Sequence, residues 1–255
     1  MSVLSRQAII DALATGLARE PWILAATLGG SFATGRVDEY SDIDLGILVE
    51  DDRVEDAFVV LRDILVSLSP IEVEHRLPDP TWHGSSQVFV RLANASPHHF
   101  VDACVIKRCD RDSFGEEERH GVALVLFDRE GLVRTVPLDG EALAAKMRAR
   151  LQTLRETYVM FQPLVERAVA RGHVAEATYW YVNLTLKGLV EVLRMRHCPD
   201  RWDFGFRYLD RDLPAEKRRA VEALCFPRDA QELAAFRVRA EAMFREEIAA
   251  LDSEP

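Results

Sequence analysis

Residues 28–49 read LGGSFATGRVDEYSDIDLGILV and join two apolar runs through a short polar loop. A Gly-Gly-Ser turn at 29–31 follows the first run, and Asp42 and Asp44 open the second. Residues two apart on a strand point to the same face, so the pattern predicts two carboxylates side by side. Two such carboxylates repel each other and need a cation to stay ionised together. The stretch therefore predicts a magnesium-type site beside a turn whose N–H groups can cradle a phosphate.

These residues resemble the signature of the DNA polymerase β-type nucleotidyltransferase superfamily, in which Gly-Ser, a spacer and Asp-x-Asp precede an apolar strand. Gly30-Ser31 and Asp42-Ile43-Asp44 carry the resemblance, and the offset from Ser31 to Asp42 matches that of small bacterial members. The alternative is a surface hairpin with two solvated aspartates, but aspartate is depleted in strands. The resemblance covers only the first half of the chain directly.

The resemblance implies both the chemistry and the nucleotide site. Asp42, Asp44 and a third carboxylate would hold two Mg²⁺ ions, which bridge the α-phosphate of a nucleoside triphosphate, expected to be ATP, and an acceptor hydroxyl. The acceptor would attack in line at the α-phosphorus, and pyrophosphate would leave. Arg36 would either pair with a phosphate oxygen or be solvated. The implied nucleotide-binding residues are Gly29, Gly30, Ser31, Arg36 and Lys187.

The third carboxylate is expected on a later strand, where Asp102 is the leading candidate. It interrupts the apolar run 100–106, and a lone buried carboxylate is costly unless something compensates it. A metal ion shared with the first two aspartates would do so, and Asp102 would then take the proton of the acceptor hydroxyl. The alternative for Asp102 is a strand bulge or an exposed edge. Glu72 and Glu74 are the rivals, although the alternation along 71–77 more often marks a solvated face.

Hydrophobic periodicity and breakers divide the chain into a mixed first part and a helical second part. The composition changes after Pro137, so we expect a catalytic domain at 1–137 and a helical substrate-binding domain at 138–255. The fold class is α+β, in which an N-terminal nucleotidyltransferase domain with a mixed sheet flanked by helices precedes an all-α bundle. Strands are predicted at 22–28, 42–49, 71–77, 87–92, 99–106 and 121–127, and helices at 4–18, 53–68, 141–171, 174–197, 214–225 and 229–251.

The helix predicted at 174–197 is apolar on most faces and carries one narrow polar stripe. The stripe is either a solvated seam of i,i+4 pairs or the wall of a cleft that faces the motif. Kanamycin and lincosamide adenylyltransferases resemble this layout, because a helical part helps to wall their acceptor site. Lys187 would then meet a nucleotide phosphate as a mobile point charge. The stripe consists of Asn183, Lys187, Glu191 and Arg194.

The composition excludes several other classes. A net charge of −10 argues against tight binding to nucleic acid and favours a small, cationic substrate. The four cysteines are scattered, which indicates reduced thiols in a cytoplasmic protein. No signal pattern and no run of membrane-spanning length is present in the sequence, so no membrane partner is expected. A homodimer is left open.

The function expected from the resemblance is Mg²⁺-dependent transfer of AMP from ATP to a hydroxyl of a small acceptor, such as an aminoglycoside- or lincosamide-like compound. One alternative is a protein adenylyltransferase of the antitoxin type, whose acceptor is a tyrosine on a partner protein. The other alternative is a regulatory module that binds nucleotide without turnover. The intact Gly-Ser and Asp-x-Asp residues argue against an inactive domain.

Overall fold

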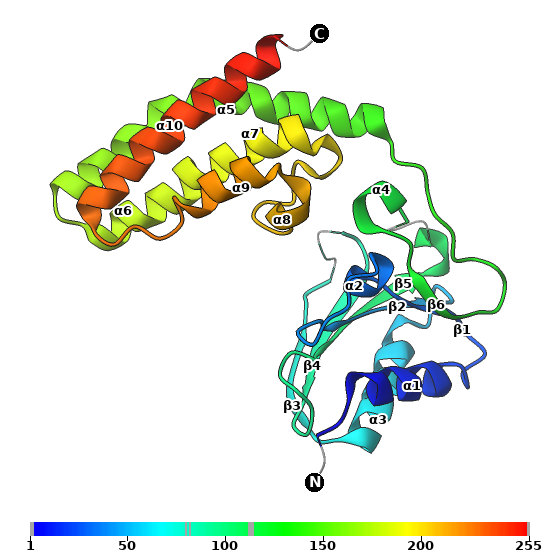
Figure 1. Cartoon of the computed structure of the whole chain (residues 1–255). Coiled ribbons are helices and arrows are strands. Elements are labelled where there is room, and N and C mark those ends of the chain that lie inside the picture. Colours follow the sequence, from blue (N-terminus) through cyan, green and yellow to red (C-terminus); the bar gives the residue numbers. More distant parts are fainter. Residues whose placement is uncertain (1–2, 80, 82, 112–114, 254–255) are drawn as a thin grey trace. The chain divides into compact units, whose positions relative to one another are not determined.

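The computed structural model describes residues 3–79, 81, 83–111 and 115–253, and the chain divides into two compact units, Met1–Leu138 and Asp139–Pro255 (Figure 1). The first unit contains a six-stranded sheet with helices. In the described part of the second unit, every regular element is a helix. The α+β class predicted from the sequence is therefore confirmed.

The six strands of the first unit form one sheet in the order β3-β4-β5-β2-β1-β6. Their bounds are β1 (Ile23–Leu28), β2 (Ile43–Val49), β3 (Ile71–Arg76), β4 (Ser86–Leu92), β5 (Val101–Lys107) and β6 (Leu124–Asp128). The pair β2 and β5 is parallel, and the other neighbouring pairs are antiparallel. The sheet is therefore mixed, as predicted, and every predicted strand is present within a few residues of its expected ends.

Helices α1 (Arg6–Leu17) and α3 (Val54–Leu68) pack on one face of this sheet (Figure 1). Side chains alternate between the two faces along a strand. On the central strands β2 and β5, the residues buried in the core with these helices are Ile43, Leu45, Ile47, Val101, Ala103 and Val105. Each fully buried aliphatic side chain contributes about 1.5–3 kcal/mol, so this face holds the unit together. The alternate positions Asp44 and Asp102 consequently point to the other face.

Two short helices, α2 (Gly30–Ala33) and α4 (Glu117–His120), lie on the side of the sheet opposite α1 and α3 (Figure 1). The sequence predicted a turn at 29–31, whereas the structure has the first turn of α2 there, with Gly29 as its N-cap residue. The first N–H groups of a helix have no intrahelical partner. The Gly29 N–H, however, donates to the Asp44 carbonyl at 2.8 Å, so the phosphate contact expected from Gly29 is not available.

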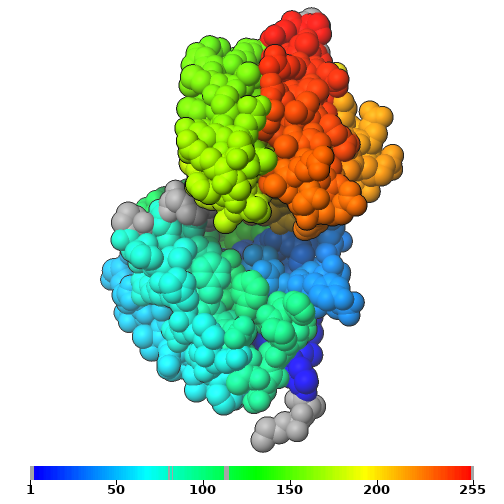
Figure 2. Space-filling model, turned by 90° about the vertical axis from the view of Figure 1, so that its left-hand side faces the viewer, coloured from blue at the N-terminus to red at the C-terminus, as the bar shows by residue number. Residues whose placement is uncertain are grey.

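The second unit is built from long helices around one apolar core. Helix α5 begins at its Asp139 cap, whose carboxylate accepts from the Ala142 N–H at 2.9 Å. Helices α5 and α10 lie side by side along the unit (green and red in Figure 2). The helices are α5 (Gly140–Ala170), α6 (Val174–Trp180), α7 (Lys187–His197), α8 (Leu209–Asp212), α9 (Ala215–Glu222) and α10 (Ala230–Ser253). The short helix α8 lies between the helices predicted at 174–197 and 214–225, where the sequence predicted no helix.

The helix predicted at 174–197 is interrupted by a π-helical segment, Tyr181–Leu186, which separates α6 from α7. A π turn contains more residues than an α turn, so it shifts the faces of the flanking helices relative to a regular 3.6-residue period. Buried polar groups line the segment. The Thr185 carbonyl accepts from the Tyr158 hydroxyl at 3.1 Å, and the Thr185 hydroxyl donates to the Gln162 side-chain oxygen at 2.7 Å.

The polar stripe predicted on this helix combines exposed and buried positions. Asn183 and Lys187 are exposed, whereas only 6% of Glu191 is exposed and Arg194 is fully buried. The Glu191 carboxylate accepts from the Arg150 guanidinium at 2.6 Å, and Arg194 donates to Asp212 at 2.8 Å. The interpretation as a solvated seam is therefore wrong for Glu191 and Arg194, which form buried ion pairs within the second unit.

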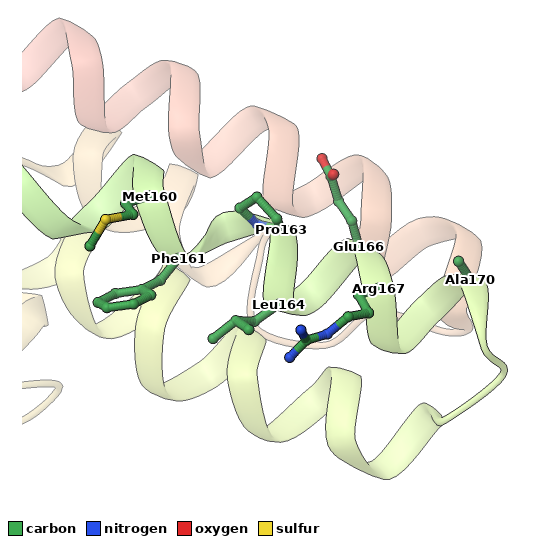
Figure 3. A pocket seen from close by; sticks show the side chains of 7 residues that line it. All are labelled: Met160, Phe161, Pro163, Leu164, Glu166, Arg167 and Ala170. Atoms are coloured by element: carbon green, nitrogen blue, oxygen red, sulfur yellow. The ribbon is translucent and has the colours of Figure 1, made fainter.

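A hollow of about 450 Å³ lies on the surface of α5 around Pro163, which is inside the helix (Figure 3). Proline lacks an N–H and clashes with the preceding turn, which opens the helix locally. Phe161 and Leu164 form an apolar side, and Glu166 is held by the Arg237 guanidinium at 2.5 Å. None of the residues that line this hollow is an aspartate, so it lacks the paired carboxylates of the motif at 28–49.

Among the described residues, no helix combines the length and the apolar character that crossing a membrane requires.

Candidate active site

The parallel pairing of β2 and β5 places Asp44 directly opposite Asp102 in the register. Both are on the sheet face that α1 and α3 leave uncovered, and both are half-buried. Asp42 lies just before β2, not within it as the sequence predicted, yet its carboxylate interacts with that of Asp44. The Asp44 carboxylate therefore has Asp42 as a neighbour in the chain and Asp102 as a neighbour on the adjacent strand.

The electrostatics of these carboxylates are unfavourable for three negative charges. Burial, together with the neighbouring Asp42 and Asp102 carboxylates, raises the pKa of Asp44 to about 7. Burial is also the main reason why the pKa values of Asp42 and Asp102 lie above their ordinary range. A bound cation would offset this repulsion and return all three groups to the ionised form.

The donor set fits a divalent metal ion that also takes oxygen atoms from a substrate. Within the described ranges, no group of three or more His, Cys, Asp or Glu side chains is arranged to hold a metal ion, so a substrate would have to supply further oxygen ligands. Mg²⁺ commonly uses one or two carboxylates and fills its remaining positions with phosphate and water oxygens. Asp42, Asp44 and Asp102 supply the hard oxygen ligands that such an arrangement requires.

Gly30 is needed because the backbone of α2 lies directly against the Asp44 carboxylate. Its φ is +52°, and a Cβ atom at this position would lie 1.7 Å from Asp44 Oδ2. The adjacent Gly29 N–H donates to the Asp44 carbonyl at 2.8 Å, which fixes the start of α2 to β2. Glycine is therefore the residue that allows this approach of helix and carboxylate.

Ser31 follows in the first turn of α2. Its hydroxyl oxygen is buried and has no hydrogen-bond partner in the described part of the chain. A buried hydroxyl without a partner is costly, and a ligand oxygen would satisfy it. With the N–H groups at the start of α2, Ser31 forms a place where phosphate oxygens can bind.

Two residues that the sequence analysis missed contact this site. Gln87 on β4 donates from its side-chain nitrogen to Asp102 Oδ1 at 2.5 Å. Arg6 donates through Nη1 to the carbonyls of Asp38 (2.6 Å) and Ser41 (2.8 Å) in the motif loop. Gln87 had a signal in the sequence, as a polar residue that opens an apolar strand. Arg6 had none, because its partners are backbone atoms more than thirty residues away.

A surface hollow of about 540 Å³ adjoins the motif loop in the first unit. Its size is within the range of ligand pockets, about 300–1,000 Å³. The Arg6 guanidinium lies 5.6 Å from the centre of the Phe32 ring, and both side chains line the hollow. The lining residues are Ser5, Arg6, Gln7, Phe32, Val37, Glu39, Ser96 and His99.

The rival carboxylates Glu72 and Glu74 are placed away from the aspartates. They are exposed on the edge strand β3, which β4 and β5 separate from β2, and each carboxylate pairs with an arginine at 3.0 Å. The geometry therefore favours Asp102 as the third carboxylate. Arg36 is exposed in the motif loop, and Lys187 is exposed on α7 of the second unit.

Comparison with known families agrees with the geometry of the first unit. Residues 11–91 match the family model described as "Nucleotidyltransferase domain". The match includes Asp42 and Asp44 and ends before Asp102. No curated protein matches the chain.

Residues 11–91 therefore belong to a nucleotidyltransferase domain of the DNA polymerase β-type superfamily, and this domain supports a transferase activity. The family uses a nucleoside triphosphate and a divalent metal ion.

Proposed function

We propose that this chain transfers AMP from ATP to a hydroxyl of a small-molecule acceptor and releases pyrophosphate. The observation that carries the proposal is the meeting of Asp44 and Asp102 on parallel strands, with the Gly30-Ser31 backbone against Asp44. A phosphate cradle and a carboxylate cluster at one place are the two parts that nucleotidyl transfer requires.

Each part has a role in the transfer. Ser31 and the N–H groups at the start of α2 bind the β- and γ-phosphates, and Asp42, Asp44 and Asp102 would hold two Mg²⁺ ions. When bound, these ions supply positive charge that neutralises the triphosphate. The acceptor oxygen forms a bond to the α-phosphorus while the bond to pyrophosphate breaks, and Asp102 accepts the hydroxyl proton. Arg36 and Lys187 are proposed as further phosphate contacts.

The acceptor is proposed to be a small cationic molecule of the aminoglycoside or lincosamide type. The chain's net charge of −10 supports this choice, because an acidic surface attracts cations and repels nucleic acid. The helical unit Asp139–Pro255 is proposed as the substrate-binding unit.

The test is incubation of the full chain with labelled ATP, Mg²⁺ and a panel of aminoglycosides and lincosamides. Pyrophosphate release that depends on a small acceptor is the expected result. Label on a protein would instead identify a protein adenylyltransferase of the antitoxin type. Nucleotide binding without turnover against all acceptors and proteins tested would identify a regulatory module and overturn the proposal.

A further inference from the structure

The Asp102 carboxylate has one oxygen atom already engaged. Its Oδ1 accepts from Gln87 Nε2 at 2.5 Å, and no hydrogen bond to Oδ2 is present among the described residues. Gln87 pairs with Cys104 in the antiparallel ladder of β4 and β5, and Phe89 pairs with Asp102. Gln87 and Asp102 are therefore diagonal neighbours on one sheet face, within reach of a long side chain.

The orientation of the Gln87 amide follows from the chemistry of its two neighbours. An ionised carboxylate only accepts hydrogen bonds, so Gln87 must present its NH₂ group to Asp102. Its Oε1 then faces His83 Nε2 at 2.9 Å, which must carry a proton to donate. The Ser85 N–H donates to His83 Nδ1 at 3.3 Å, which is consistent with the proton on Nε2. His83, Gln87 and Asp102 therefore form one directed chain of hydrogen bonds.

Burial strengthens the hydrogen bonds that link His83, Gln87 and Asp102. Only 9% of Gln87 is exposed, so water competes little for its amide, and a hydrogen bond to an ionised acceptor is about twice as strong as a neutral one. The carboxylate cannot rotate without breaking the bond at Oδ1. Oδ2 is consequently the oxygen left for a reacting hydroxyl or a metal ion.

We propose that Gln87, held by His83, is a positioning residue that fixes Asp102 so that Oδ2 alone serves the transfer reaction. This inference rests on the proposed function and adds to it a residue outside the Gly-Ser and Asp-x-Asp motif. An outer partner of this kind is typically worth about 10–100-fold in metal affinity or activity.

The first test replaces Gln87 by Met, which keeps the length of the side chain and removes the donor. The Gln87→Met variant should lose about 10–100-fold in kcat, while KM for ATP changes by about twofold or less, because Ser31 and α2 are untouched. Electron paramagnetic resonance of Mn²⁺ in the presence of a non-hydrolysable ATP analogue gives a readout apart from activity. Mn²⁺ affinity should fall by about tenfold. Gln152→Met on α5 is the matched control and should behave like the wild type.

A second pair of variants tests the role of His83. His83→Gln retains a group that can donate to Gln87 Oε1, whereas His83→Leu does not. His83→Leu should lower kcat, and His83→Gln should recover at least part of the loss. In the Gln87→Met background, His83→Leu should have little additional effect, because the chain of hydrogen bonds is already broken.

The outcomes separate this inference from the proposed function. A wild-type chain that transfers no nucleotide would overturn both. An active wild type with unchanged kcat and Mn²⁺ affinity in Gln87→Met would overturn the inference alone. Equal losses in His83→Leu and His83→Gln, or fully additive losses in the double variant, would show that His83 does not help Gln87 to position Asp102.

Discussion

At the scale of single residues, Gly30 connects the backbone of α2 to the chemistry of Asp44. Replacing Gly30 by Ala brings a Cβ atom to within 1.7 Å of Asp44 Oδ2, so the helix or the carboxylate must move. We expect a loss of about 100-fold in transfer rate, since a displacement of about 1 Å has that effect. Gly35→Ala is the matched control, because Gly35 also has a positive φ (+66°) but would meet no atom within 4 Å. Equal losses in the two variants would attribute the effect to backbone strain instead of the contact with Asp44.

The motif carboxylates give a second prediction at this scale. Asp42→Asn should abolish transfer while the protein stays folded, because losing one charged ligand weakens metal binding and relieves repulsion. Transfer assays and circular dichroism check both parts. Turnover like that of the wild type would exclude the paired aspartates from catalysis.

Asp44 also makes the stability of the metal-free protein depend on pH. Burial raises its pKa in the folded state to about 7, so the carboxyl prefers to stay protonated in the fold. The free energy of unfolding is therefore highest below the ordinary pKa near 3.8, where Asp44 is protonated in both states. It falls as the pH rises through about 7, where Asp44 must ionise in the fold. Asp44→Asn should therefore be more stable than the wild type at pH 8, and the difference should shrink towards pH 4. Urea unfolding with a chelator present measures this, and a difference that does not vary with pH would contradict it.

The choice between Asp102 and Glu74 can be tested directly. Asp102→Asn should lose at least about 100-fold in rate while retaining the fold. Glu74→Gln should lose about tenfold or less, equivalent to ~1.4 kcal/mol in the barrier, because this exposed carboxylate pairs only with Arg62. An inactive Glu74→Gln with an active Asp102→Asn would reverse the assignment of the third carboxylate.

At the scale of elements, α7 is anchored in the second unit by a buried arginine. Arg194 donates to Asp212 at 2.8 Å and to the Gly205 carbonyl at 2.6 Å, and both ionic side chains are fully buried. Breaking a buried ion pair is strongly destabilising. Asp212 would keep its pair with Arg201, but the Gly205 and Arg201 carbonyls would lose the donor that Arg194 supplies.

Arg194→Met should consequently lower the free energy of unfolding of this unit by ~3–5 kcal/mol. Arg245→Met, which breaks a pair whose arginine is exposed, should change it by at most about 1 kcal/mol. Chemical denaturation followed by tryptophan fluorescence measures both variants. Equal effects in the two variants would show that burial of the pair is not the decisive factor.

At the scale of the whole molecule, the net charge of −10 and the carboxylate cluster both repel a triphosphate. ATP should therefore bind measurably only when a divalent cation is present. Isothermal titration calorimetry with Mg²⁺ and with excess chelator checks this expectation. Equal ATP affinity under the two conditions would contradict a metal-bridged nucleotide.

The sequence predicted most of the fold because the signals for its elements are local. The apolar run before Leu28, the alternation through Leu45 and the helical spacing along α3 each depend on neighbouring residues only. The π-helical segment was missed, since the residues that stabilise it, Tyr158 and Gln162, lie on another helix. Arg194 was expected in a solvated stripe because the groups that bury and pair it, Asp212 and the Gly205 carbonyl, lie outside this helix.

By itself, the sequence determined the Gly-Ser and Asp-x-Asp motif, the strand that carries it and the change to a helical second half. Each of those features depends on a short segment, so the spacing and type of its residues are enough to predict it. Only the tertiary structure decided that Asp44 lies opposite Asp102. It also decided that Gln87 donates to one oxygen of Asp102 and that Arg6 donates to a carbonyl of the motif loop. The physical reason is that such contacts depend on strand order and register. These are set by the packing of the whole sheet, not by any one segment.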